Sequence, residues 1–164
     1  MLEAGSENFV RSISLMAVLG QSYLALDEEE KAIGVYKRML RVQPESVLAL
    51  NNLAWLTRAT DPGQALEYAS RGNELAPQDP FMLSTFGTVL VANGDVDKGE
   101  QTLRSAVALY PENMQLKLDL GRLLLDIGKG DAARPYLELV VEGAENAETV
   151  AAARDLLSNT GKGG

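Results

Sequence analysis

The chain of 164 residues contains no cysteine and no histidine. Without cysteine it can form no disulfide and has no thiolate nucleophile, so the redox state of its compartment stays open. Without histidine it lacks the side chain that most often serves as a general base near neutral pH and as a metal ligand. We therefore expect no catalytic residue, no metal site and no cofactor, and the sequence predicts a protein that is not an enzyme.

Aromatic and basic residues are also scarce. Aromatics make up 5% of the chain and apolar residues 46%, so leucine and alanine must fill the core. This composition favours helix by intrinsic propensity, and the sequence predicts an all-α fold. With 23 acidic and 15 basic residues, the net charge is −8. Because nucleic acids are bound mainly through Lys and Arg, nucleic-acid binding is disfavoured.

Long hydrophobic runs are missing as well. The longest, such as residues 14–20, are too short to cross a bilayer, and no basic region followed by an apolar one stands at the N-terminus. We expect no membrane insertion by this chain. The opening residues MLEAG resemble an added start, which leaves room for a signal or an earlier domain upstream.

What the chain does contain is a repeat. A large apolar residue followed by a small one recurs at Leu19-Gly20, Leu53-Ala54, Phe86-Gly87 and Leu120-Gly121, with spacings of 34, 33 and 34 residues. Proline recurs beside these pairs at positions 44, 77 and 111, with spacings of 33 and 34. Such a period is typical of stacked helical hairpins.

The first unit reads Met16-x2-Leu19-Gly20-x2-Tyr23, then Ala32-x3-Tyr36, then Pro44. It resembles the tetratricopeptide repeat (TPR) pattern W-x2-L-G-x2-Y, A-x3-F, P in its spacing. The second and third units follow in register. The fourth has Lys117 at its first position and lacks the closing proline.

The resemblance implies a right-handed α-solenoid of four TPR helical hairpins plus a C-terminal capping helix. We expect repeats at 13–46, 47–79, 80–113 and 114–147. Residues 1–12 would hold the added start and an extension of the first helix. Residues 148–160 would form the capping helix, opened by Asn146, and 161–164 a flexible tail.

Local signals agree with the hairpins. Small residues in the first helix of each unit (Gly20, Ala54, Gly87 and Gly121) and in the second (Ala32, Ala65, Gly99 and Ala133) are expected to let the two helices approach closely. N-caps are expected at Asp27, Asp61, Asp95 and Asp131 for the second helices, and at Ser46 and Asp79 for first helices.

In TPR proteins the first helices line a concave face, where ligands usually lie. Carried over position by position, this implies a ligand-binding groove of Gln21, Asn51, Asn52, Trp55, Arg58, Phe81, Ser84, Thr88, Leu118 and Arg122. Two amides within a helix have poor propensity and are costly if buried unpaired, which favours ligand contact for Asn51 and Asn52. Trp55 is either a binding anchor or ordinary core between helices.

The resemblance implies a non-catalytic scaffold that binds a protein or peptide segment. Residues at the groove positions differ from those of TPR clamps for chaperone tails, which disfavours that partner. ALNNLAWL, DPGQALEYA and DAARPYLELV are similar to the C-terminal repeats of long bacterial TPR proteins, including lipoproteins linked to exopolysaccharide export. That similarity favours a periplasmic location over a cytoplasmic one. The alternative function is homodimerisation through the first hairpin, by apolar residues such as Phe9, Ile13 and Met16.

Overall fold

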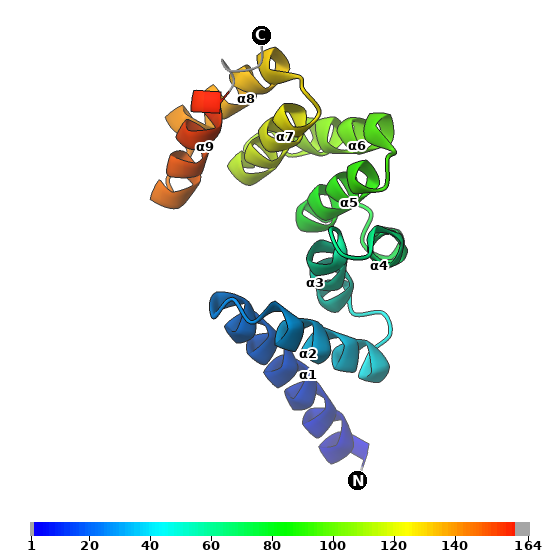
Figure 1. The fold of residues 1–164 in the computed structure, drawn as a ribbon. Helices are drawn as coiled ribbons and strands as arrows, with labels where there is room; N and C mark the ends of the chain where they lie inside the picture. Colours follow the sequence, from blue (N-terminus) through cyan, green and yellow to red (C-terminus); the bar gives the residue numbers. More distant parts are fainter. Residues whose placement is uncertain (1, 160–164) are drawn as a thin grey trace. The chain divides into compact units, whose positions relative to one another are not determined.

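The computed structural model describes residues 2–159, with side chains for residues 12–158. Within this range the backbone forms nine α-helices and no strand (Figure 1). Their bounds are α1 Leu2–Ala25, α2 Glu29–Val42, α3 Val47–Thr57, α4 Pro62–Leu75, α5 Pro80–Ala92, α6 Val96–Leu109, α7 Met114–Asp126, α8 Gly130–Gly143 and α9 Ala147–Asn159. The expected fold class, all-α with four helical hairpins and a last helix, is confirmed. The expected tail at 161–164 and the side chain of Phe9 lie outside what is described.

The helices group into two compact units, Met1–Thr85 and Phe86–Gly164, with the boundary inside α5. In the first unit, α2 packs against α1 and α3, and α3 packs against α4. In the second unit, α7 packs against α6, α8 and α9, and α8 packs against α9. Neighbours in the sequence are therefore neighbours in space, as in stacked repeats. Below, α1, α3, α5 and α7 are called first helices, and α2, α4, α6 and α8 second helices.

Glycine in the first helices makes room for a large side chain of the second helix. A Cβ atom on Gly20 would lie 2.6 Å from the Tyr36 ring, and one on Gly121 would lie 2.5 Å from Cδ2 of Leu137. The expected packing role of these glycines is confirmed. In both hairpins, however, the close neighbour lies four residues beyond the expected small residue: Tyr36 rather than Ala32, and Leu137 rather than Ala133.

The second hairpin solves the same packing problem with two alanines. Ala54 and Ala69 occupy the positions that Gly121 and Leu137 hold in the fourth hairpin, and both are fully buried. The first helix of this hairpin therefore carries a methyl group, and the second helix carries a small residue opposite it. The close approach of two helices limits the combined volume of the two facing side chains rather than the size of either one.

Three of the turns before second helices share a backbone geometry. In two of them the N-cap is not the predicted aspartate. Asp27, Gly94 and Gly128 have positive φ angles of 57°, 89° and 76°. The N-cap follows one residue later, so Glu28 precedes α2 and Lys129 precedes α8. The predicted caps at Asp27 and Asp131 are wrong. Asp27 takes the left-handed conformation that aspartate tolerates better than most residues, and Asp131 lies in the first turn of α8, where the helix dipole favours an acid.

The other predicted caps are located correctly. The carboxylate of Asp61 accepts a hydrogen bond from the Gln64 N–H at 3.1 Å, and Asp95 is an N-cap that instead pairs with Lys98 at 3.2 Å. Side-chain oxygens also cap three first helices and α9. Ser46, Asp79 and Asn146 are caps as predicted. Asn113, the cap of α7, was not predicted.

The last helix, α9, spans Ala147–Asn159 in the described range, and so begins one residue before the expected start at 148. Ala153 on its apolar stripe is buried, whereas Glu148, Arg154 and Asp155 on the opposite side are exposed. The apolar side packs against α7 and α8. A polar outer surface of this kind suits a terminal element of a repeat array.

Candidate functional site

The residues of the predicted groove fall into two sets, one in each unit. The first unit holds Gln21 on α1, Asn51, Asn52, Trp55 and Arg58 on or directly after α3, and Phe81 and Ser84 on α5. The second unit holds Thr88 on α5, and Leu118 and Arg122 on α7. The richest cluster of these residues lies on and directly after α3.

Trp55 is at the surface and carries a stacked cation. Its side chain is 38% exposed, so it is not ordinary core. The guanidinium carbon of Arg58 lies 3.7 Å from the centroid of the Trp55 ring, within range of a cation–π interaction. Nη1 of Arg58 also donates a hydrogen bond to the Trp55 carbonyl. The backbone bond and the stacking together place a flat aromatic surface and a positive charge next to each other.

The two asparagines differ in how their amides are satisfied. Nδ2 of Asn52 donates to the carbonyl of Leu48 at 2.8 Å, so part of this amide is paired within α3. Oδ1 of Asn51 is buried and accepts no hydrogen bond from the described residues. A buried acceptor without a donor costs about 1–3 kcal/mol, which leaves Asn51 with an unmet need for a partner.

Large apolar side chains are exposed beside these polar groups. Phe81, in the first turn of α5, is 66% exposed. Leu48 on α3 stands 33 residues earlier, at the equivalent repeat position, and is exposed as well. Leu48 was not predicted from the sequence, although its equivalence to Phe81 identifies it. Leu48, Asn51, Asn52, Trp55, Arg58, Phe81 and Ser84 are together called the α3–α5 surface.

The set in the second unit is less suited to binding. Leu118 is only 3% exposed, so its side chain belongs to the core and offers a ligand no contact area. Thr88 and Arg122 are half-buried. Nearby on α7, Nε2 of Gln115 donates to the Asp119 carboxylate at 2.9 Å, so both of these side chains have a partner in the protein.

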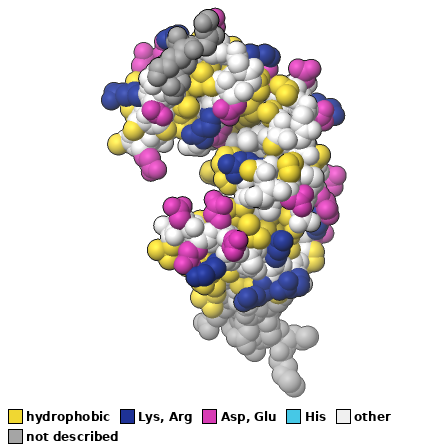
Figure 2. Space-filling view, viewed as in Figure 1, with side chains coloured by type: hydrophobic (Ala, Val, Ile, Leu, Met, Phe, Trp, Pro, Cys, Tyr) yellow, Lys and Arg dark blue, Asp and Glu magenta, His cyan; other side chains and the backbone are white. Residues whose placement is uncertain are grey.

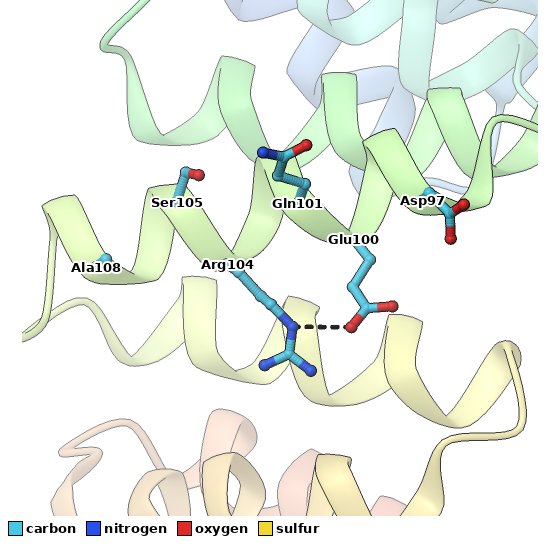
Figure 3. Close-up of a pocket in the computed structure, with 6 residues that line it drawn as sticks. All are labelled: Asp97, Glu100, Gln101, Arg104, Ser105 and Ala108. Atoms are coloured by element: carbon cyan, nitrogen blue, oxygen red, sulfur yellow. Dashed lines mark hydrogen bonds and ion pairs between the residues drawn. The ribbon is translucent and has the colours of Figure 1, made fainter.

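A charged cluster on α6 and α8 was not predicted from the sequence. Glu100 accepts from Nε of Arg104 at 2.8 Å and from Nζ of Lys129 at 2.5 Å, and Arg104 also donates to the hydroxyl of Tyr136 at 3.1 Å. Hydrogen bonds from Lys129 and Arg104 lower the pKa of Glu100. Figure 3 shows Glu100 and Arg104 projecting to one side of α6 while Gln101 and Ser105 project to the other. The cluster joins successive second helices, which is a structural role.

The same stretch of α6 borders a depression of about 420 Å³, lined by Asp97, Glu100, Gln101, Arg104, Ser105 and Ala108. All six residues lie on one helix, so the depression has no opposite wall to enclose a small molecule.

Across the described residues, no group of three or more acids is placed to hold a metal ion. Acidic, basic and apolar side chains are interspersed over the face seen in Figure 2. No helix in the described range is long and apolar enough to span a bilayer.

Comparison with known proteins supports the class that the fold defines. Residues 90–157 match the tetratricopeptide repeat family model, and these residues run from α5 to α9. The match begins after the α3–α5 surface, so it supports the repeat architecture and does not identify a ligand. Proteins with this fold generally mediate protein–protein interactions on the surfaces of their stacked helices.

Among individual proteins, a TPR repeat-containing protein of Pseudomonas aeruginosa is 27% identical over 117 residues, which is 68% of this chain. The chain spans only 19% of the length of that relative.

A thermophilic TPR protein of Thermus thermophilus has a similar structure, with a TM-score of 0.79, 20% identity and coverage of 92% of this chain and 84% of that one. PilF of Pseudomonas aeruginosa gives a TM-score of 0.70 at 22% identity, covering 96% of this chain and 78% of that one. MamA of Desulfovibrio magneticus gives 0.64 at 19% identity, covering 79% and 74%. These similarities show the fold alone.

Proposed function

We propose that the chain is a protein-interaction scaffold whose α3–α5 surface binds an extended protein segment. The observation that carries the proposal is the exposed Trp55 with Arg58 stacked on its ring, next to the amides of Asn51 and Asn52. Tryptophan and arginine are the residue types most enriched at binding hot spots. Amides in the same place suit the N–H and C=O groups of an extended backbone.

Charge indicates the kind of segment. Neither α3 nor α5 contains an acidic residue, and α1 contains none from Ser12 to Ala25. Arg58 is therefore the only charged residue contributed to this surface, although the whole chain carries a net charge of −8. The surface suits a segment with an apolar side chain for Trp55 and a neighbouring carboxylate for Arg58.

The unpaired acceptor of Asn51 supports the same proposal. Its buried Oδ1 lacks a donor, and a rotation of the side chain toward a bound backbone N–H would supply one. Ser84, the equivalent residue on α5, is half-buried and adds a hydroxyl group at the same repeat position. Binding would then satisfy the Asn51 acceptor, which has no donor among the described residues.

The test uses the single tryptophan of the chain. Because Trp55 is the only Trp, its fluorescence emission reports directly on this surface. Peptides selected on the whole chain from a random displayed library would be titrated against it. We expect the bound peptides to shift the Trp55 emission, to share an apolar residue beside an acid, and to weaken with added salt.

Matched variants separate binding from folding. Trp55→Ala should reduce affinity for the selected peptides at least roughly tenfold, as expected for a hot spot, while helical circular dichroism stays unchanged. Leu139→Ala removes a similarly exposed apolar side chain on α8 and should leave binding intact. Selected peptides that bind both variants as tightly as the parent chain would refute the proposed surface.

We further propose that the chain is part of a larger bacterial TPR protein linked to envelope or exopolysaccharide assembly. The support is the similarity of ALNNLAWL and DAARPYLELV to repeats of such proteins. Fractionation of cells carrying a tagged chromosomal copy should place the protein in the periplasm, and deletion of its gene should reduce secreted polysaccharide. A cytoplasmic protein whose loss leaves polysaccharide unchanged would contradict this role.

A further inference from the structure

Helix α1 exposes an apolar stripe that no other first helix exposes within the described residues. Leu15 is 69% exposed, Val18 60% and Leu19 41%. Their spacing of three and four residues places the three side chains on one face of the helix. Single exposed leucines are ordinary on protein surfaces, but three on one face of one helix form a continuous patch.

The repeat shows what this face normally does. The residues equivalent to Leu15 are Ala49 on α3, Met82 on α5 and Leu116 on α7, and each is almost completely buried. Met82, for example, lies against Gly72 of α4, the second helix of the preceding hairpin. The stripe on α1 therefore occupies a face that is built for contact with another helix.

The face is also free of charge. Ser12 to Leu26 contains no acidic or basic residue, in a chain in which 23% of residues are charged. The net charge of −8 on each copy opposes association at any surface. Contact along Ser12 to Leu26 buries apolar side chains and adds no local pair of like charges to that repulsion.

We propose that the α1 stripe of Leu15, Val18 and Leu19 is a homodimer interface, in which α1 of one copy packs antiparallel against α1 of a second copy. A twofold axis near Val18 places Leu15 of each copy beside the C-terminal end of the stripe on the other copy. The same residues then contact each other in both directions, as an isologous interface requires. This changes the residues expected from the sequence. Met16 is buried, Ile13 is half-buried and the side chain of Phe9 is not described, so the exposed contact residues are the other three.

Molar mass measured by light scattering after size exclusion tests the proposal on the whole chain, over a range from about 1 µM to about 1 mM. We expect the mass to rise toward twice 17.6 kDa with concentration. Leu15→Glu should raise the dimer dissociation constant roughly 100-fold, because each dimer loses two buried leucines and places two carboxylates in an apolar contact. Leu109→Glu on α6 changes a comparably exposed leucine and should leave the dimer unaffected.

Cysteine crosslinking checks the geometry, since the chain has no cysteine of its own. Val18→Cys near the axis should form a disulfide-linked dimer under mild oxidation, and Leu109→Cys should crosslink far more slowly. A chain that stays monomeric throughout, or a dimer equally sensitive to both glutamate variants, would overturn the proposal. Trp55→Ala should leave the mass unchanged, so failure here and failure of the α3–α5 surface are distinguishable.

Discussion

At the scale of single residues, two glycines of the first hairpin have opposite roles. A Cβ on Gly20 would meet the Tyr36 ring, whereas one on Gly34 of α2 would have open space around it. We expect Gly34→Ala to stabilise the protein by about 1 kcal/mol through helix propensity. Gly20→Ala should instead destabilise it by about 1–3 kcal/mol, because the ring must move. Urea unfolding followed by circular dichroism measures both.

The second hairpin supplies the control for this prediction, because its own sequence has Ala54 opposite a small residue. In the double variant Gly20→Ala, Tyr36→Ala, the clash disappears and only the loss of the buried ring remains. The two substitutions should therefore couple by roughly 1 kcal/mol or more in a double-mutant cycle. Additive effects would show that Tyr36 does not restrict position 20.

Glu100 makes part of the stability dependent on pH. Its pKa lies below the usual value of 4.5, because Lys129 and Arg104 donate to the charged form. A lowered pKa in the folded state adds stability above pH 4.5, and that stability is lost as the pH falls through the folded-state value. Glu100→Gln should thus destabilise the chain by roughly 0.5–1 kcal/mol at pH 7, and by less at pH 3. Thermal unfolding at both values measures the difference; a constant difference would contradict the assignment.

At the scale of helices and turns, the repeat period predicted the fold because packing fixes residue size at each position. The spacing of Gly20, Ala54, Gly87 and Gly121 located the first helices, and the stripe after Asn146 located α9 to within one residue at its start. The turns were predicted less well, since an aspartate near a helix start suits a cap, a left-handed turn or a first helical turn alike. Asp27 and Asp131 illustrate the last two.

The groove was the hardest feature to predict. The positional pattern placed Trp55 and Phe81 at the surface, where the structure has them exposed. It also included Leu118, although a leucine at this position can fill the gap between helices as easily as it can face outward. Exposure depends on neighbouring side chains, which a repeat pattern alone does not specify. The glutamate cluster on α6 was missed because Lys129, just before α8, and Tyr136 on α8 are about one repeat away in sequence.

The shared turn geometry leads to a prediction for the first hairpin. Asp27 has a φ angle of 57°, where Gly94 and Gly128 stand in later hairpins. Asp27→Gly should stabilise the protein by about 0.5–1 kcal/mol, because glycine adopts this conformation without steric cost. Asp27→Ala should destabilise it relative to the parent chain. Chemical denaturation of the three proteins would show the order Gly, Asp, Ala; an alanine variant more stable than the parent would refute the turn assignment.

At the scale of the whole molecule, contacts between neighbouring helices imply that stability is distributed locally. Leu137 on α8 is fully buried over Gly121 of α7. Leu137→Ala should cost about 2–5 kcal/mol in the hairpin that contains it. In a repeat protein this loss passes to other helices only through successive interfaces. Amide hydrogen exchange should therefore accelerate most in α7, α8 and α9, which contact one another, and least in α1 and α2.

Leu109→Ala, at an exposed position, serves as the control and should change exchange little. Equal acceleration in all helices of the Leu137 variant would contradict local unfolding and would mean that the chain unfolds as one cooperative structure.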